Sequence, residues 1–117
     1  MTMNSALADR LLQRMRAGEC LKVPHATASD LREFVSARSK CHDNVNRWCH
    51  ENPGHKPLRG WLVTSTLFDK HSVVDRGASA LLDITPLNDR SYSYFLPHDG
   101  TQDEFEKLPN QVIALDI

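Results

Sequence analysis

The period of the hydrophobic pattern changes at the turn Asn52-Pro53-Gly54, and this change constrains the fold more than any other feature of the chain. Before the turn, apolar residues recur at helical spacing. After it, short segments rich in branched and aromatic residues alternate with turn-forming residues, as is typical of strands. The pattern predicts an α+β domain, with N-terminal helices packed on a mainly antiparallel sheet of about four strands.

Two helical stretches are expected in the first half of the chain, one between Ser5 and Gly18 and one from Ser29 to Asn52. The second stretch has two interpretations. Its apolar stripe keeps one phase through Cys41, which favours a single long helix. Alternatively, Ser39 caps a new helix that begins near Cys41.

Strands are expected after the turn. The segments that read as strands cover residues 60–65, 71–75, 79–85 and 92–96. Residues 20–23 and 112–115 are candidates for further short strands, and residues 101–108 for a helical turn.

Composition limits the class of protein. With 117 residues, 40% hydrophobic and 25% charged, the chain fits one globular domain spanning residues 1–117. Three cysteines are too few, and odd in number, for a disulfide framework, so reduced thiols and a cytoplasmic location are expected. A net charge of -1 gives no broad attraction to nucleic acid or membranes, and neither is expected as a partner. No cofactor motif is recognised, so no cofactor is predicted.

A hairpin is expected around Arg76-Gly77-Ala78. With these three residues as the loop, Val74 pairs with Ala80 and His71 lies opposite Asp83. Directly opposed side chains have Cβ atoms about 4.5 to 5.5 Å apart, so the carboxylate can fix the imidazole tautomer. A loop longer by one residue turns Asp83 to the other face. As an ordinary surface pair, the two residues would contribute about 0.2 to 1 kcal/mol.

Cys41 and Cys49 are the candidate nucleophiles. Cysteine chemistry needs a thiolate, and a helix N-terminus or an imidazolium stabilises that charge. Cys41 meets this condition if a helix starts near Ser39, whereas in one continuous helix it is a small buried residue. Cys49 lies in mid-helix on the apolar stripe and fits less well.

A cysteine at a helix start, then a strand beginning with His, then a strand carrying Asp resembles the transglutaminase-like branch of papain-like enzymes. The matching residues are Cys41, His71 and Asp83. The resemblance implies a thiol enzyme that hydrolyses or transfers an amide or isopeptide bond of a protein or peptide substrate. The chain also resembles small bacterial proteins with a Cys-His-x-Asn-Val-x-x-Trp segment, which implies no function.

Two function hypotheses follow. In the first, the protein is a cysteine-dependent acyl-transfer enzyme in which Cys41 attacks, His71 moves the proton and Asp83 orients the imidazole. In the second, it is a non-catalytic interaction domain. Trp61 and His98 are secondary candidates for the rim of a cleft.

A metal site has weaker support. On one helix, Cys41 and Cys49 would lie about 12 Å apart and could not share a zinc ion. A weak site through Cys49, His50 and His55 is the remaining arrangement, and no metal is predicted.

Overall fold

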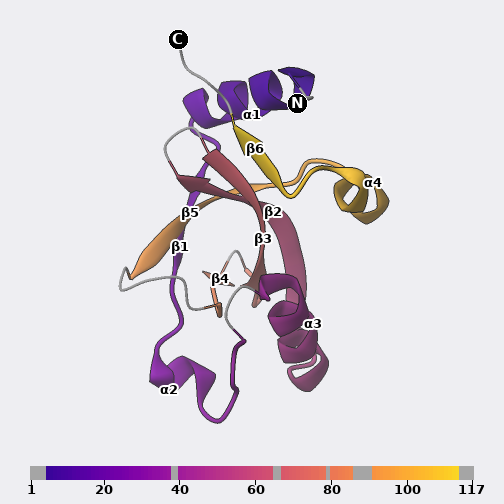
Figure 1. The fold of residues 1–117 in the computed structure, drawn as a ribbon. Coiled ribbons are helices and arrows are strands. Elements are labelled where there is room, and N and C mark those ends of the chain that lie inside the picture. Colours follow the sequence, from indigo (N-terminus) through magenta and orange to yellow (C-terminus); the bar gives the residue numbers. More distant parts are fainter. Residues whose placement is uncertain (1–4, 38–39, 65–66, 79, 86–90, 114–117) are drawn as a thin grey trace.

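The computed structural model describes residues 5–37, 40–64, 67–78, 80–85 and 91–113. In these ranges the chain forms α1 (Ser5–Arg16), β1 (Leu21–Pro24), α2 (Ala28–Leu31), α3 (Cys41–Glu51), β2 (Lys56–Thr64), β3 (Leu67–Asp75), β4 (Leu81–Leu82), β5 (Tyr92–Pro97), α4 (Gln102–Lys107) and β6 (Gln111–Ile113) (Figure 1). The α+β class is confirmed. The expected number of strands is wrong, since this part of the chain holds six, and α4 lies near the C-terminus. No helix within it is long and apolar enough to cross a membrane.

The strands form one antiparallel sheet in the order β1-β5-β2-β3-β4, with β6 beside β3. This sheet curls until its two edges meet. A parallel bridge joins His25, after β1, to Asp83, after β4. The Asp83 N–H donates to the Pro24 carbonyl (2.9 Å), and the Ala26 N–H donates to the Asp83 carbonyl (2.8 Å). The curled sheet encloses a small apolar interior formed by Val23, Leu58, Val73, Leu81 and Phe95.

Gly60 of β2 allows the sheet to close tightly around Phe95. A Cβ atom at this position would lie 2.3 Å from the Leu96 carbonyl oxygen and 2.7 Å from the Phe95 ring. Both distances are far below van der Waals contact, so only glycine lets β2 and β5 approach this closely.

Two helices cover the outside of the sheet at different ends (Figure 1). The apolar face of α1 packs near β6 in a cluster formed by Leu7, Leu11, Leu12, Trp61, Phe68, Leu96, Phe105 and Val112. The apolar face of α3 packs near β4 in a cluster formed by Val45, Trp48, Val74, Leu82 and Ile84. Burial of these faces is the main favourable contribution to folding.

The interpretation of one long helix from Ser29 is wrong, because α2 ends at Leu31 and α3 begins at Cys41. Thr27, rather than Ser29, caps α2. Arg32 then leaves the helical region with φ 56°. The segment before α3 is instead held by buried Asn44, whose Oδ1 accepts from the Ala37 N–H (2.9 Å) and whose Nδ2 donates to the Ala37 carbonyl (2.8 Å).

The N-terminal end of α3 therefore falls at Cys41. Its N-cap residue is Lys40, whose side chain makes no capping hydrogen bond. The expected cap, Ser39, lies outside the described residues. Cys41 consequently occupies the first helical position, where the helix dipole favours negative charge.

The predicted hairpin register is also wrong. Val74 pairs with Leu82 rather than Ala80, so the loop covers residues 76–80 and is two residues longer than expected. Ser79 lies outside the described residues. Because side chains alternate with a period of two, a shift of two residues keeps Asp83 on its predicted face.

Candidate active site

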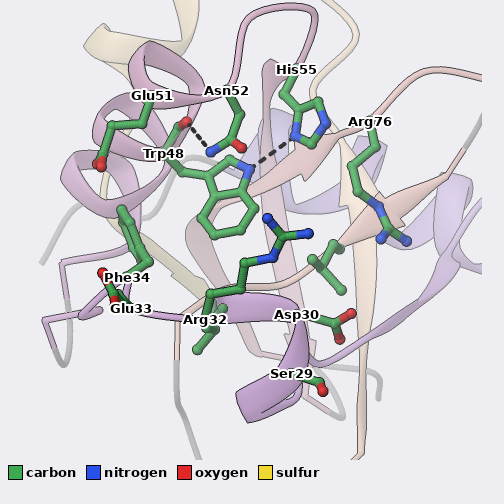
Figure 2. A pocket seen from close by; sticks show the side chains of 12 residues that line it. Ser29, Asp30, Arg32, Glu33, Phe34, Trp48, Glu51, Asn52, His55 and Arg76 are labelled. Carbon is green, nitrogen blue, oxygen red and sulfur yellow. Dashed lines mark hydrogen bonds between the residues drawn. The ribbon is translucent and has the colours of Figure 1, made fainter.

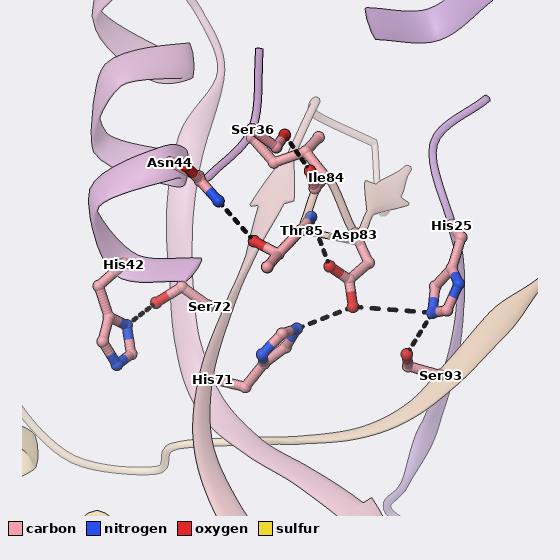
Figure 3. Close-up of polar contacts among 10 residues, drawn as sticks. All are labelled: His25, Ser36, His42, Asn44, His71, Ser72, Asp83, Ile84, Thr85 and Ser93. Atoms are coloured by element: carbon pink, nitrogen blue, oxygen red, sulfur yellow. Dashed lines mark hydrogen bonds and ion pairs between the residues drawn. The ribbon is translucent and has the colours of Figure 1, made fainter. Parts of the chain in front are cut away.

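The structure brings Cys41, His71 and Asp83 together from three different elements. His71 Nε2 lies 2.8 Å from Asp83 Oδ2 (Figure 3), and the Cys41 thiol interacts with the same imidazole. The His71 and Asp83 side chains are 3% and 0% exposed, while Cys41 is only partly buried. The arrangement is a thiol at a helix start, an imidazole and a buried carboxylate in series.

Asp83 contacts His71 although the strands pair in a different register from the predicted one. Extending the observed pairing by one residue places Asp83 opposite Val73, diagonal to His71 on the same face. There the Thr85 N–H donates to Asp83 Oδ1 over 3.1 Å, which leaves Oδ2 directed at the imidazole. The backbone bridge to β1 holds the main chain of Asp83 in the same place. The carboxylate is therefore fixed at both its backbone and its side chain.

A second histidine contacts the same carboxylate. His25 Nε2 lies 4.0 Å from Asp83 Oδ2 and also contacts Ser93 Oγ at 2.5 Å (Figure 3). Sequence analysis missed both His25 and Ser93. The available signal was alternation, since His25 follows buried Val23 by two residues and Ser93 precedes buried Phe95 by two. Each polar residue thus continues the inward-facing series of its strand.

The charges of this site shift the pKa of His71 strongly. Burial alone lowers the pKa of a histidine, but the hydrogen bonds to Asp83 and Cys41 and their negative charges outweigh it. The result is a His71 pKa raised to about 9. The imidazole thus readily holds a proton at neutral pH.

The three cysteines differ in the direction of their pKa shifts. At Cys41, burial opposes ionisation, but the His71 hydrogen bond and charge and a hydrogen bond to the Ser72 backbone prevail, so the pKa is lowered. Burial raises the pKa of Cys20 and of Cys49. Cys41 is therefore the thiol with the greatest tendency to ionise.

A second chain of hydrogen bonds involves His42 and Ser72, the residues that directly follow Cys41 and His71 in the sequence. Arg59 Nη1 donates to Ser72 Oγ over 2.8 Å, and Ser72 Oγ contacts His42 Nδ1 at 2.5 Å (Figure 3). The chain ties the first turn of α3 to β2 and β3. It thereby holds the helix that begins at Cys41 against the strand that carries His71.

Of the two residues expected at the rim of a cleft, Trp61 lies in the core, whereas His98 is partly exposed in the segment before α4. Trp61 is 1% exposed and belongs to the core, with its ring centroid 5.9 Å from that of Phe105. His98 lies in the turn before α4, where its Nε2 is 3.1 Å from the Thr101 carbonyl oxygen.

The residues considered for a weak zinc site, Cys49, His50 and His55, are not gathered around one point. His55 Nδ1 accepts a hydrogen bond from Trp48 Nε1 over 2.9 Å, at the edge of a cavity of about 850 Å³ (Figure 2). Among the described residues, no three or more His, Cys, Asp or Glu side chains gather as a metal site would require.

Comparisons of the chain with protein-family models, with curated proteins and with solved structures found no match.

Proposed function

We propose that the protein is a small cysteine-dependent acyl-transfer enzyme that hydrolyses or transfers an amide or isopeptide bond. The observation that supports this is the position of His71, which hydrogen-bonds the buried Asp83 carboxylate and interacts with the Cys41 thiol at the start of α3. A purely structural His-Asp pair does not require a thiol at a helix N-terminus as its third member. A perturbed thiol beside a perturbed imidazole is instead typical of nucleophilic catalysis.

Each side chain has a defined role in this proposal. Asp83 accepts the Nε2 proton of His71, which leaves Nδ1 facing the thiol. His71 takes the thiol proton, and the Cys41 thiolate forms a bond to the substrate carbonyl carbon. When the C–N bond breaks, His71 returns the proton to the leaving amine. Water or an acceptor amine then attacks the thioester, giving up a proton through His71 and releasing Cys41.

The N-terminus of α3 supports the oxyanion of this reaction. Since Lys40 supplies no side-chain cap, the backbone N–H groups of the first turn beside Cys41 are donors suited to a negatively charged oxygen. The helix dipole acts in the same sense, both on the oxyanion and on the thiolate.

Alkylation tests the proposal without knowledge of the substrate. Near neutral pH, iodoacetamide should modify Cys41 at least about tenfold faster than Cys20 or Cys49, because only Cys41 has a lowered pKa. His71→Gln should remove most of this advantage. His50→Gln, which changes an exposed histidine on the same helix, is the matched control and should leave it intact. Mass-spectrometric mapping of modification rates at each thiol gives the result.

The alternative is a non-catalytic interaction domain, and the large cavity beside α3 favours it. This cavity of about 850 Å³ is lined by the aromatic Phe34 and Trp48 and by charged residues including Arg32 and Arg76 (Figure 2). Aromatic and arginine side chains at an open cavity suit protein recognition. If all three thiols react alike, and only after unfolding, the catalytic proposal is refuted and this alternative stands.

A further inference from the structure

A groove of about 260 Å³ lies at the first turn of α3, the helix that begins with the proposed nucleophile, and the catalytic roles above do not use it. Its walls include His42 and Lys70, the sequence neighbours of Cys41 and His71, together with Arg59. The charge of Cys41 also acts on the Arg59 guanidinium. Lys70 and His71 are consecutive on β3, so their side chains face opposite sides of the sheet. The groove therefore lies on the face of β3 that carries Ser72, next to the first turn of α3, which begins at Cys41.

Arg59 is held rigidly in this groove. Its Nη1 donates to Ser72 Oγ (2.8 Å), its Nη2 to Asn46 Oδ1 (2.6 Å) and its Nε to Gln102 Oε1 (3.3 Å). A guanidinium has five N–H donors, so two remain after these bonds to described residues. Rigid, preorganised guanidinium groups bind carboxylates well, because little entropy is lost on binding.

His42 is a polar, uncharged member of the groove wall. Its Nδ1 contacts Ser72 Oγ, which also accepts from Arg59 Nη1. Burial, together with the charges of Arg59, His71 and Lys70, lowers the pKa of His42 and favours the neutral ring. A neutral imidazole still carries one N–H group, so His42 adds polarity to the groove without adding a negative charge.

The charges of the groove favour an anion. Arg59 and Lys70 are cations, and Glu106 is the carboxylate among the described lining residues, so the formal charge is +1. Glu106 is itself occupied, because its Oε1 accepts from Gln102 Nε2 over 3.2 Å. Lys70 Nζ makes a long contact of 3.4 Å to the Glu106 carbonyl oxygen and lies 4.8 Å from the centroid of the Phe105 ring. The groove thus offers positive charge and N–H donors in excess of what its own acceptors use.

We infer that this groove binds a carboxylate of the substrate, so that the enzyme acts on acyl groups whose neighbouring residue is acidic. The inference rests on the proposed function and names its substrate class. The volume of about 260 Å³ accommodates a side chain the size of Asp or Glu.

A matched pair of alkylating agents tests the inference. Iodoacetate and iodoacetamide deliver nearly the same group, but only iodoacetate carries a carboxylate. The iodoacetate-to-iodoacetamide rate ratio at Cys41 should exceed the ratio at Cys20 of the same protein by about fivefold or more; Cys20 is the reference because the charge of Arg59 also acts on Cys49. The iodoacetate rate at Cys41 should also saturate with concentration. Succinate at constant ionic strength should slow the iodoacetate reaction and leave the iodoacetamide reaction unchanged.

Variants separate the groove from general charge. Lys70→Gln and Arg59→Gln should each lower the iodoacetate-to-iodoacetamide ratio at Cys41 by about threefold or more, whereas Arg76→Gln, outside the groove, should not. If Cys41 keeps its His71-dependent reaction with iodoacetamide but shows no preference for iodoacetate, the inference is refuted and the proposed function survives. If Cys41 lacks its advantage with iodoacetamide, both are refuted.

Discussion

Replacing Asp83 by Asn removes the charge that holds the proton on His71. The His71 Nε2 to Asp83 Oδ2 contact of 2.8 Å joins two side chains that are 3% and 0% exposed. An Asn keeps the size of the side chain and an oxygen for the Thr85 N–H, but its amide nitrogen donates toward His71 instead of accepting. The imidazole must then carry its proton on Nδ1, facing Cys41. Asp83→Asn should therefore impair both the protonation and the orientation of His71.

The expected loss of stability follows from the pKa of His71, which rises from 6.5 to about 9 on folding. At 1.36 kcal/mol per pH unit, this difference corresponds to about 3 kcal/mol. Because the folded pKa lies above the unfolded one, the stabilisation is complete below pH 6.5 and is lost as the pH rises through about 9. Cys41 supplies part of it, so Asp83→Asn should cost about 2 kcal/mol near pH 6. A surface pair would have cost about 1 kcal/mol or less.

The assay combines NMR titration of the His71 ring with urea unfolding near pH 6 and near pH 10. In Asp83→Asn the pKa of His71 should fall, and the difference in unfolding free energy from the wild type should shrink at the higher pH. Asp69→Asn, on the same strand, is the control; that carboxylate accepts from Gln111 and does not contact His71. An unchanged His71 titration, or an equal loss of stability at both pH values, would refute the argument.

Two further predictions concern the sheet and the helix start that support the site, and the unfolding free energy in urea tests both. Gly60→Ala should lower the unfolding free energy by about 1 to 3 kcal/mol, because its Cβ would meet the Leu96 carbonyl and the Phe95 ring; a loss under about 0.5 kcal/mol would show that β2 and β5 adjust freely. Asn44→Ala should cost about 2 kcal/mol, since it leaves the Ala37 N–H and carbonyl without their partners, and it should also slow alkylation of Cys41 by loosening the start of α3.

The sequence was informative where the pattern is local. The change of period at the turn Asn52-Pro53-Gly54 predicted the α+β class, and counting outward from the expected hairpin loop placed His71 and Asp83 on the same face. That second prediction survived a wrong register, because the loop exceeded the expected length by two residues. An error of one residue would have separated the two side chains.

Contacts between distant segments were not predictable from the sequence. The break before Cys41 depends on Asn44, whose amide satisfies both backbone groups of Ala37 in a way that hydrophobic periodicity does not record. Trp61 illustrates the same limit, because its pattern is compatible with a cleft rim or a core, and only the packing of α1 and Phe105 over it decides for the core.

Closure of the sheet links the candidate chemistry to the whole fold. Asp83 is held in place by backbone bonds to Pro24 and Ala26, which belong to the opposite edge of the strand path. Its carboxylate faces His71 from β3, and His71 in turn faces Cys41 at the start of α3. Because each member of this series comes from a different segment, a loss of packing at the β1 edge should displace Asp83 and lower the reactivity of Cys41. Under the proposed function, we therefore expect an activated Cys41 only in the closed sheet, and three ordinary cysteines in an unfolded or partly folded chain.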